Sequence, residues 1–494
     1  MMEEAVIAVD AEDVVGGLVA QGVELSVADG DILYTGPAEA LGEDALEGLR
    51  VLKPKVVGLL ERNCARGVVR LGPTSLEQQR MGWRSRSDTN AASYNVCMRV
   101  DFCGDLDVRR LSATIDKLAT RHEILRSRFS RYGDHLLQEV LAPGRGLLQV
   151  LEPHALAGLS DAEVARWCSR RGSAAFNLAM EAPARWCLAP LSGGRAVLLM
   201  TFHHIACDGW SIDRLLAELA RLYELEELVA EPPSCTPFDF AGWERGWLTE
   251  TRVNDARAFF SDELRGAALS PTFLRTERPT RPGGDSGAVV RHISEDLVAS
   301  VQGLACAIAV SELSVYFAAF ALLLAEETRE GDCAAVIAVL NRTRPEHELV
   351  IGLTRNAQAI RCSVAKEDTL ASAALQMSTR VERASVFQWF PISLLLDPTA
   401  RREIDARCLP VTFAFAAAAD DTLDLGNVRA SVKDVFLGAA RAGLSLFVRR
   451  RGQIAEAFFE YAKDHIDEVV VGPIADRYLA IVAQAADVAL AEVP

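Results

Sequence analysis

Two adjacent histidines followed by an aspartate form the segment best suited to chemistry, HHIACDG at residues 203–209. Histidine titrates near neutral pH, so His204 can accept a proton from a nucleophilic amine, or orient that amine, while it attacks a thioester carbonyl. Asp208 is expected to fold back and hold the segment, by pairing with an arginine rather than by touching a substrate. Gly209 permits close backbone approach, and its N–H can help to bind an oxyanion. We therefore predict His203, His204, Asp208 and Gly209 as the catalytic group.

Other uses of the same residues have to be weighed. A single His and Asp at this spacing more often belong to a packed core, so the surrounding segments must decide. A zinc site needs at least three ligands and one open position, and no third His or Cys lies at a suitable spacing. We therefore expect no metal. Cys207 lacks a dedicated base for a nucleophilic role and is expected to fill space in the loop.

A buried strand and an amphipathic helix are predicted on either side of this segment. Residues 196–202 (AVLLMTF) form a continuous apolar run of strand length. After the segment, apolar residues recur at helical spacing. They are Ile212, Leu215, Leu216, Leu219, Leu222 and Tyr223. The two histidines are thus expected in a strand-to-helix connection, where a rigid scaffold often presents catalytic groups.

Composition limits the partners. The formal charge of −16 and the pI near 5.1 argue against nucleic acid, because binding phosphates requires a basic surface. The 11 cysteines include no C-x-x-C pair and are expected to be reduced. The start of the chain lacks the pattern of a signal peptide, and no apolar run is long enough to span a bilayer. We expect a cytoplasmic protein with no membrane partner.

The first 65 residues are predicted to form a small unit of one helix, a hairpin and two helices. Asp10 can cap the first helix, which Gly22 can end. Asp29-Gly30 is a hairpin-turn signal between two short strands at residues 23–27 and 32–34. The two later helices are expected over residues 43–52 and 54–62. Because so small a core is marginal, a partner chain or homodimer formation through this unit is expected to complete it.

Several segments in order resemble the condensation domains of non-ribosomal peptide synthetases. The segment FHHIACDGWSIDRLLAEL, residues 202–219, resembles the central motif of that family. TSLEQQRM at residues 74–81 is similar to the opening motif and keeps Ser75, Gln78 and Arg80. RHEILRSRF at residues 121–129 is similar to the second motif over almost its whole length. The likeness extends from about residue 71 to the C-terminus.

The resemblance implies an α/β (α+β) fold of two chloramphenicol-acetyltransferase-like lobes in a V-shaped pseudo-dimer, over residues 66–248 and 249–494. Donor and acceptor carrier proteins are implied at opposite ends of a tunnel, with the substrates on phosphopantetheine and no permanently bound cofactor. In the family the second His acts on the acceptor, which corresponds to His204, and the Asp forms a structural ion pair. Arg126 is our candidate partner for Asp208. The candidates for the tunnel wall are Ser75, Gln78, Trp210, Ser211 and Asn356.

The second half departs from the family pattern. NRTRPE at residues 341–346 has Asn341 where glycine is usual before the arginine. IGLTRN at residues 351–356 has Thr354-Arg355 in place of Phe-Val. These segments line the donor side and the lobe-bridging latch in relatives, so the departures concern the identity of the donor more than the chemistry.

The N-terminal unit resembles a second family. Residues 14–60 are similar to the tubulysin-type docking domain, which receives a short linear motif from the C-terminus of an upstream synthetase subunit. An unpaired hairpin edge invites an added strand. The residues predicted to contact that partner are Val23, Leu25, Val27, Ile32 and Tyr34. The alternative is an ordinary N-terminal subdomain of residues 1–65 that packs on the lobes.

Three functions remain open from the sequence. The first is amide formation between a donor acyl or peptidyl thioester and an acceptor aminoacyl thioester. The second is ester formation, because the same base and tunnel suit a hydroxyl acceptor. The third is a non-catalytic recruitment module, which the intact double histidine disfavours and the altered second-half motifs favour.

Overall fold

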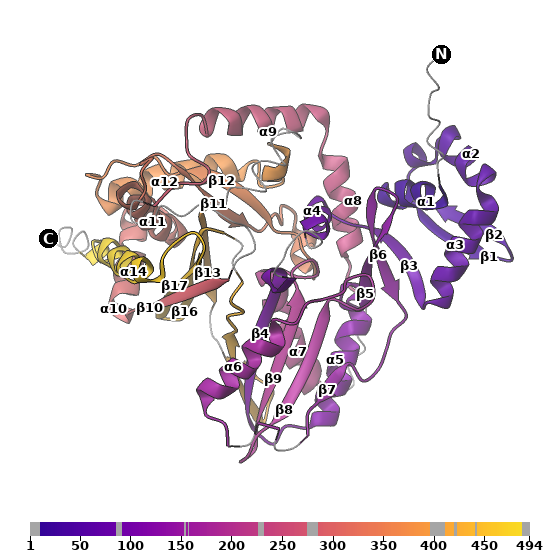
Figure 1. Cartoon of the computed structure of the whole chain (residues 1–494), viewed down its shortest axis with the longest axis horizontal. Coiled ribbons are helices and arrows are strands. Elements are labelled where there is room, and N and C mark those ends of the chain that lie inside the picture. The colour runs from indigo at the N-terminus through magenta and orange to yellow at the C-terminus, as the bar shows by residue number, and fades with distance from the viewer. Residues whose placement is uncertain are drawn as a thin grey trace.

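The computed structural model describes residues 10–84, 91–152, 155–156, 158–225, 232–273, 285–395, 411–418, 422–439 and 442–486. Two lobes, each built around a six-stranded sheet, make up most of the chain (Figure 1). A smaller N-terminal unit lies at one end of the first lobe (Figure 1). The predicted mixed α/β class with two lobes is confirmed.

The N-terminal unit has the predicted order of helix, hairpin and two helices. Its first helix begins after Asp10, whose side chain accepts a hydrogen bond from Ala11 N. Asp29 and Gly30 both have positive φ, as a two-residue hairpin turn with this sequence requires. The elements are α1 (Ala11–Ala20), β1 (Glu24–Ala28), β2 (Asp31–Thr35), η1 (Ala38–Leu41), α2 (Glu43–Val51) and α3 (Lys53–Ala65).

The apolar core of this unit continues into the first lobe. A three-stranded sheet with the order β3-β6-β5 supplies Leu71, Tyr132 and Leu137 to the same core as Val15 of α1. A Cβ at Gly16 would lie 2.2 Å from the Tyr132 carbonyl oxygen, so α1 packs closely on this sheet. The strands are β3 (Val68–Pro73), β5 (Ser127–Tyr132) and β6 (His135–Leu141). The unit is therefore joined to the first lobe by a shared core.

The main sheet of the first lobe has the order β14-β15-β4-β9-β8-β7. One face packs on α5 and α7, through buried residues such as Leu111 and Leu215. The other face packs on α6, through Val164 and Cys168. The elements are α4 (Leu76–Arg84), η2 (Ala91–Tyr94), β4 (Asn95–Gly104), α5 (Val108–Arg121), η3 (Glu123–Arg126), β7 (Leu148–Val150), α6 (Asp161–Gly172), β8 (Ala184–Pro190), β9 (Arg195–His203), α7 (Gly209–Glu224), β14 (Thr422–Asp424) and β15 (Val428–Asp434).

The second lobe is built around a sheet with the order β10-β17-β16-β13-β11-β12. Its central helix is α11, almost all of whose residues are buried, which explains the apolar composition of that stretch. Apart from β14 and β15, the elements from residue 237 onward are α8 (Pro237–Trp247), α9 (Glu250–Glu263), β10 (Ser286–Ile293), α10 (Glu295–Ala307), α11 (Glu312–Glu327), β11 (Ala334–Val339), η4 (Pro345–Leu349), β12 (Asn356–Arg361), α12 (Leu370–Ser385), η5 (Ile392–Leu394), β13 (Val411–Ala418), β16 (Leu444–Arg451), β17 (Ile454–Ala462) and α14 (Glu468–Val482).

The structure corrects the predicted division of the lobes at residues 248 and 249 in one place. β14 and β15 belong to the second half of the chain, but β15 pairs antiparallel with β4 in the sheet of the first lobe. Side chains of β16 hold this crossing segment from the other lobe. Arg449 pairs with Asp434, and Arg451 donates to the Val432 carbonyl at 2.8 Å. The two lobes are thus linked by a pair of strands that crosses from the second half of the chain into the sheet of the first lobe.

The most apolar helices of the second lobe do not provide a single membrane-spanning segment. No helix among the described residues is by itself long and apolar enough to cross a bilayer. Taken together, α10 and α11 have the length and composition of a membrane span, but the pair is bent by 104°. Both helices contribute to the buried core of the second lobe.

Glu244 on α8 is fully enclosed and gives a stability prediction. Burial raises the pKa of its carboxyl to about 7, although a hydrogen bond from Leu76 N at 2.7 Å opposes the rise. Below pH 4.5 the folded and unfolded states both hold the proton, so the burial cost develops as pH rises from 4.5 and is complete above 7. We expect Glu244→Gln to raise stability at pH 8 by up to about 3 kcal/mol.

Thermal unfolding at pH 5 and pH 8 measures this effect, with Glu61→Gln on an exposed face of α3 as the matched control. The gain for Glu244→Gln should be larger at pH 8 than at pH 5. An equal gain at both values would show that the Glu244 carboxylate carries no burial cost.

Candidate active site

The segment HHIACDG forms the predicted strand-to-helix connection. β9 ends at His203, and α7 begins at Gly209. Asp208 is the N-cap of α7, and its side chain accepts a hydrogen bond from Ser211 N at 2.9 Å. A Cβ at Gly209 would meet no atom within 4 Å, so the space beside this residue is open. The strand and the capped helix fix both ends of the loop.

His204 is buried, and its tautomer is set by the backbone of its own loop. Its Nδ1 lies 2.6 Å from the Cys207 carbonyl oxygen. Because a carbonyl oxygen only accepts, Nδ1 carries the proton in the neutral ring. Nε2 then carries the lone pair, which is the arrangement needed to accept a proton from a nucleophile or to orient it.

His203 has a different environment. Its Nδ1 accepts a hydrogen bond from Ile205 N at 3.1 Å. Its ring lies 6.0 Å from the rings of both Tyr94 and Phe176. Its backbone N–H donates to the Pro183 carbonyl at 2.8 Å. These contacts place His203 in a packed position that supports the loop.

Asp208 forms a buried ion pair with Arg342, so the prediction that Arg126 is its partner is wrong. Arg342 Nη1 lies 2.9 Å from Asp208 Oδ2, and Arg342 Nη2 lies 3.1 Å from Asp208 Oδ1, a bidentate geometry. Burial raises the pKa of the Asp208 carboxyl, but Arg342 and Ser211 outweigh it, so the net pKa is lowered. Arg126 instead contacts the Ala119 carbonyl at 3.1 Å and Glu123 at 3.4 Å.

Arg342 reaches the loop from the second lobe, in the segment between β11 and η4. The sequence favoured Arg126 because it lies in the most complete motif of the first lobe, and no spacing rule links residue 208 to a residue 134 positions later. The NRTRPE segment was nevertheless a signal that could have identified Arg342.

The two departures from the family pattern have structural explanations. Asn341 has φ of 54°, a conformation that glycine adopts freely and that asparagine tolerates better than most residues. Thr354 and Arg355 both donate backbone N–H groups to Asp208 Oδ2 at 3.2 Å, and Thr354 Oγ1 lies 3.2 Å from the same oxygen. The changed residues thus still support the loop carboxylate.

The candidates for the tunnel wall mainly hold the loop. Gln78 donates from Nε2 to the Ile205 carbonyl at 3.0 Å and accepts from Ser75 N at 2.9 Å, and both residues are buried. The buried Ser211 hydroxyl lies 2.8 Å from the Gly352 carbonyl of the second lobe. These contacts give Ser75, Gln78 and Ser211 structural partners that brace the histidine loop.

The other two tunnel candidates are Asn356 in the second lobe and Trp210 at the start of α7. Asn356 begins β12 and donates to the Gln388 carbonyl at 3.1 Å. Trp210 donates from its indole nitrogen to the Glu348 carbonyl at 3.0 Å. The Trp210 contact links the two lobes, whereas the Asn356 contact lies within the second lobe. A role for either residue in lining a tunnel stays a prediction.

Two alternative chemistries can be checked against this geometry. Burial and the neighbouring Asp208 raise the pKa of the Cys207 thiol well above its ordinary value, which makes Cys207 a poor nucleophile. In the part of the chain that the structure describes, no three His, Cys, Asp or Glu side chains cluster closely enough to hold a metal ion.

The comparison with protein families decides the assignment. The model of the condensation-domain family matches residues 71–487, which includes both lobes and the histidine loop. The chain belongs to the condensation-domain family. The N-terminal unit lies outside the matched residues.

Curated relatives of this condensation-domain chain include large synthetases. Malpinin synthetase of Mortierella alpina is 25% identical over 414 residues, covering 81% of this chain and 5% of that protein. Phosphinothricin tripeptide synthetase PhsC of Streptomyces viridochromogenes is 26% identical over 426 residues, covering 83% of this chain and 39% of that protein. This chain thus spans less than half the length of either relative.

Solved structures confirm the predicted pair of chloramphenicol-acetyltransferase-like lobes. The first condensation domain of the CDA synthetase superimposes with a TM-score of 0.71 at 17% identity, covering 84% of this chain and 96% of that one. The X-domain in complex with OxyB from teicoplanin biosynthesis gives a TM-score of 0.69 at 23% identity, covering 84% and 93%.

Proposed function

We propose that this condensation domain forms an amide bond between two carrier-bound substrates. The supporting observation is the loop in which His204 Nδ1 is engaged by the Cys207 carbonyl, leaving Nε2 as the proton acceptor. The acceptor amine attacks the donor thioester carbonyl carbon, so a C–N bond forms and the C–S bond breaks. His204 orients the amine or takes its proton, and the departing thiolate is protonated to a thiol.

The remaining groups have supporting roles in this proposal. The Gly209 N–H is a candidate donor to the developing oxyanion, because Gly209 begins α7 and the first N–H groups of a helix have no partner within it. Both thioesters are carried on the phosphopantetheine arms of donor and acceptor carrier proteins, with no permanently bound cofactor. We place the reaction in the cytoplasm, where such reduced carrier thiols persist.

Ester formation remains the variant closest to this mechanism, because a hydroxyl acceptor can use the same histidine. Acceptor carriers loaded with an amino acid and with its matched hydroxy acid separate the two. We expect transfer to the amine, with a product that resists mild alkaline hydrolysis after release from the carrier. A product formed only with the hydroxy acid, and cleaved by the same treatment, would establish ester formation instead.

A non-catalytic recruitment module is a second candidate, because the fold is also similar to an X-domain solved in complex with OxyB. The paired Asp208 and the engaged His204 favour catalysis. Absence of product with every acceptor, together with retained binding of a second protein, would favour recruitment.

We further propose that the N-terminal unit docks a C-terminal linear motif of an upstream synthetase subunit. Among the described residues, β2 pairs on one side only, with β1. Leu33 and Tyr34 on β2 are 53% and 44% exposed, whereas Val23 and Leu25 are buried in the core of the unit and cannot contact a partner. The predicted contact set is therefore corrected to the side of the hairpin that carries β2.

The two remaining predicted contact residues, Val27 and Ile32, face each other across the hairpin and are partly buried. A partner strand on β2 would cover Ile32 more readily than Val27, because Ile32 lies on β2 itself. A second copy of this chain pairing through the same edge is the alternative occupant.

Changing Tyr34 to Ser tests the docking proposal without removing the core that α1 shares with the first lobe. We expect turnover with an upstream partner at low concentration to fall, by as much as about 100-fold if the partner is no longer tethered. Turnover with excess free carrier should stay unchanged. Val51→Ser on α2, another exposed apolar position of the unit, is the matched control.

An equal effect of both changes, or of Tyr34→Ser on free carriers, would contradict docking at β2. Light scattering distinguishes the alternative occupant, because a dimer that Tyr34→Ser converts to a monomer would identify the edge as a homodimer interface.

A further inference from the structure

Two cavities flank α6 on the face of the first-lobe sheet that this helix covers. One is about 400 Å³ and lies by the start of α6, against β4, β9 and β15. The other is about 680 Å³ and lies by the end of α6, against β7, β8 and β9. Both volumes are in the range of small-molecule sites. The side chains that line them differ in one decisive respect.

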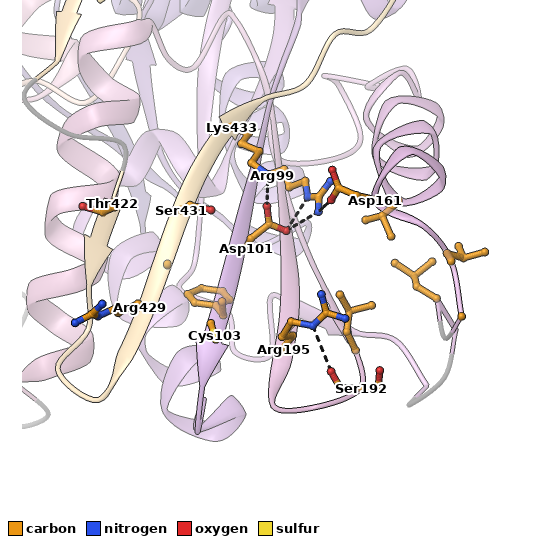
Figure 2. Close-up of a pocket in the computed structure, with 18 residues that line it drawn as sticks. Arg99, Asp101, Cys103, Asp161, Ser192, Arg195, Thr422, Arg429, Ser431 and Lys433 are labelled. Atoms are coloured by element: carbon orange, nitrogen blue, oxygen red, sulfur yellow. Dashed lines mark hydrogen bonds and ion pairs between the residues drawn. The ribbon is translucent and has the colours of Figure 1, made fainter. Parts of the chain in front are cut away.

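Carboxylates line the smaller cavity and balance its buried cation. Figure 2 shows Asp101 between Arg99 and Lys433, with Asp161 on the far side of Arg99. Arg99 is buried, and its Nε lies 2.8 Å from Asp101 Oδ1. An anion entering this cavity would meet two carboxylates. The smaller cavity therefore has two carboxylates beside its four cations, which are Arg99, Arg195, Arg429 and Lys433.

The larger cavity is lined by arginines without a carboxylate. Arg170, Arg171 and Arg185 contribute to its wall, and no Asp or Glu is among the described residues that line it. This is unusual for a chain with a formal charge of −16. Such a local excess of positive charge attracts an anion against the overall field of the protein.

The partners of the three arginines leave this positive charge only partly compensated. Arg185 pairs with Glu181 at 2.9 Å, outside the set of lining residues. Arg171 donates to Gln149, a neutral side chain, and lies over the Trp167 ring at 5.8 Å. Arg170 is exposed and forms no ion pair with any described acidic residue. Two of the three guanidinium groups thus lack a described carboxylate.

The rest of the wall is apolar or uncharged. Trp167 is partly buried, Leu147 is 37% exposed, and Leu199 is buried. An arginine pair recognises the planar, bidentate arrangement of a carboxylate or phosphate group, while an apolar wall accommodates a hydrocarbon body. The lining therefore matches an amphipathic anion rather than a bare inorganic ion.

We propose that the larger cavity is a second ligand site, which binds a small organic anion with a carboxylate or phosphate head and an apolar body. The head contacts Arg170 and Arg171, and the body lies against Leu147 and Trp167. The site adjoins the histidine loop but does not include it: no residue of 203–209 lines the cavity, although Thr201 precedes His203 by two positions on β9. The proposal does not depend on the reaction that His204 performs.

Calorimetric titration of the whole chain with four matched probes tests this site. The probes are octyl phosphate, octanoate, octanol and inorganic phosphate. We expect the two amphipathic anions to bind, octanol and inorganic phosphate to bind at least about tenfold more weakly, and affinity for the anions to fall with added salt. The ranking of octyl phosphate and octanoate identifies the preferred head group.

Four single substitutions locate the binding. Arg171→Gln and Arg170→Gln should each weaken the better anion about tenfold or more, which corresponds to about 1.4 kcal/mol per contact. Arg195→Gln in the smaller cavity should leave affinity unchanged, as should a further control, Arg166→Gln, at an exposed position of the same helix outside both cavities. Melting temperature verifies that each variant is folded, and Arg170→Gln keeps the test valid if Arg171→Gln unfolds.

Equal binding of octanol and the anions would show a merely apolar cavity. No binding of either anion, or binding lost in Arg195→Gln and kept in Arg170→Gln, would overturn the proposed site.

Discussion

Alanine in place of His204 is expected to reduce turnover by about 100-fold or more, because it removes the group that accepts or orients the acceptor proton. The structure supports this through the engaged Nδ1, which leaves Nε2 as the acceptor. The loss should appear mainly in kcat, since the carrier surfaces are untouched. Single-turnover measurement with loaded donor and acceptor carriers gives this value directly.

His203→Ala is the matched comparison, because it removes a neighbouring imidazole that packs between Tyr94 and Phe176. We expect a smaller loss of turnover and a lower melting temperature, the reverse of the pattern for His204→Ala. Equal losses of turnover in two folded variants would contradict the assignment of the proton-accepting role to His204 alone.

Removal of the Asp208 carboxylate is expected to destabilise the protein by roughly 3 to 5 kcal/mol, because it leaves the Arg342 charge buried and unpaired. The side chains of the pair are only 2% and 1% exposed, so water cannot replace the lost partner. Asp208→Ala should therefore lower both the melting temperature and the turnover. Arg126→Ala, the partner predicted from the sequence, should not reproduce this effect.

The double variant Asp208→Ala/Arg342→Ala should be less destabilised than the sum of the two single variants, because neither charge is then left alone. Strictly additive losses, or an unchanged melting curve for Asp208→Ala, would contradict the buried pair. The pKa of Asp208 is lowered in the folded protein, so the carboxylate contributes its full stabilisation at pH values above the ordinary carboxyl pKa. This stabilisation is lost only as the pH falls through the lowered pKa.

Local patterns predicted the elements around the site well. The apolar run ending at Phe202 forms β9, and the helical spacing after Gly209 forms α7. Asp29-Gly30 forms the expected hairpin turn. Each of these depends on a few neighbouring residues, so periodicity and turn chemistry are sufficient.

Features that depend on distant pairing could not be derived in the same way. β15 leaves the lobe of its sequence neighbours and pairs with β4, about 330 positions earlier in the chain. The partner of Asp208 likewise comes from the other lobe. Val23 and Leu25 were predicted to face a partner, but the shared core with the three-stranded sheet buries them. An alternating pattern shows that one face of a strand is apolar, not what covers that face.

The proposed amide formation is tested most directly by intact mass spectrometry of both carriers after incubation with the whole chain. The acceptor carrier should gain the mass of the donor acyl group, and the donor carrier should lose it and return to a free thiol. Neither change should occur with His204→Ala at the same incubation time. A donor carrier that keeps its acyl group, or an acyl group transferred equally by His204→Ala, would contradict the account.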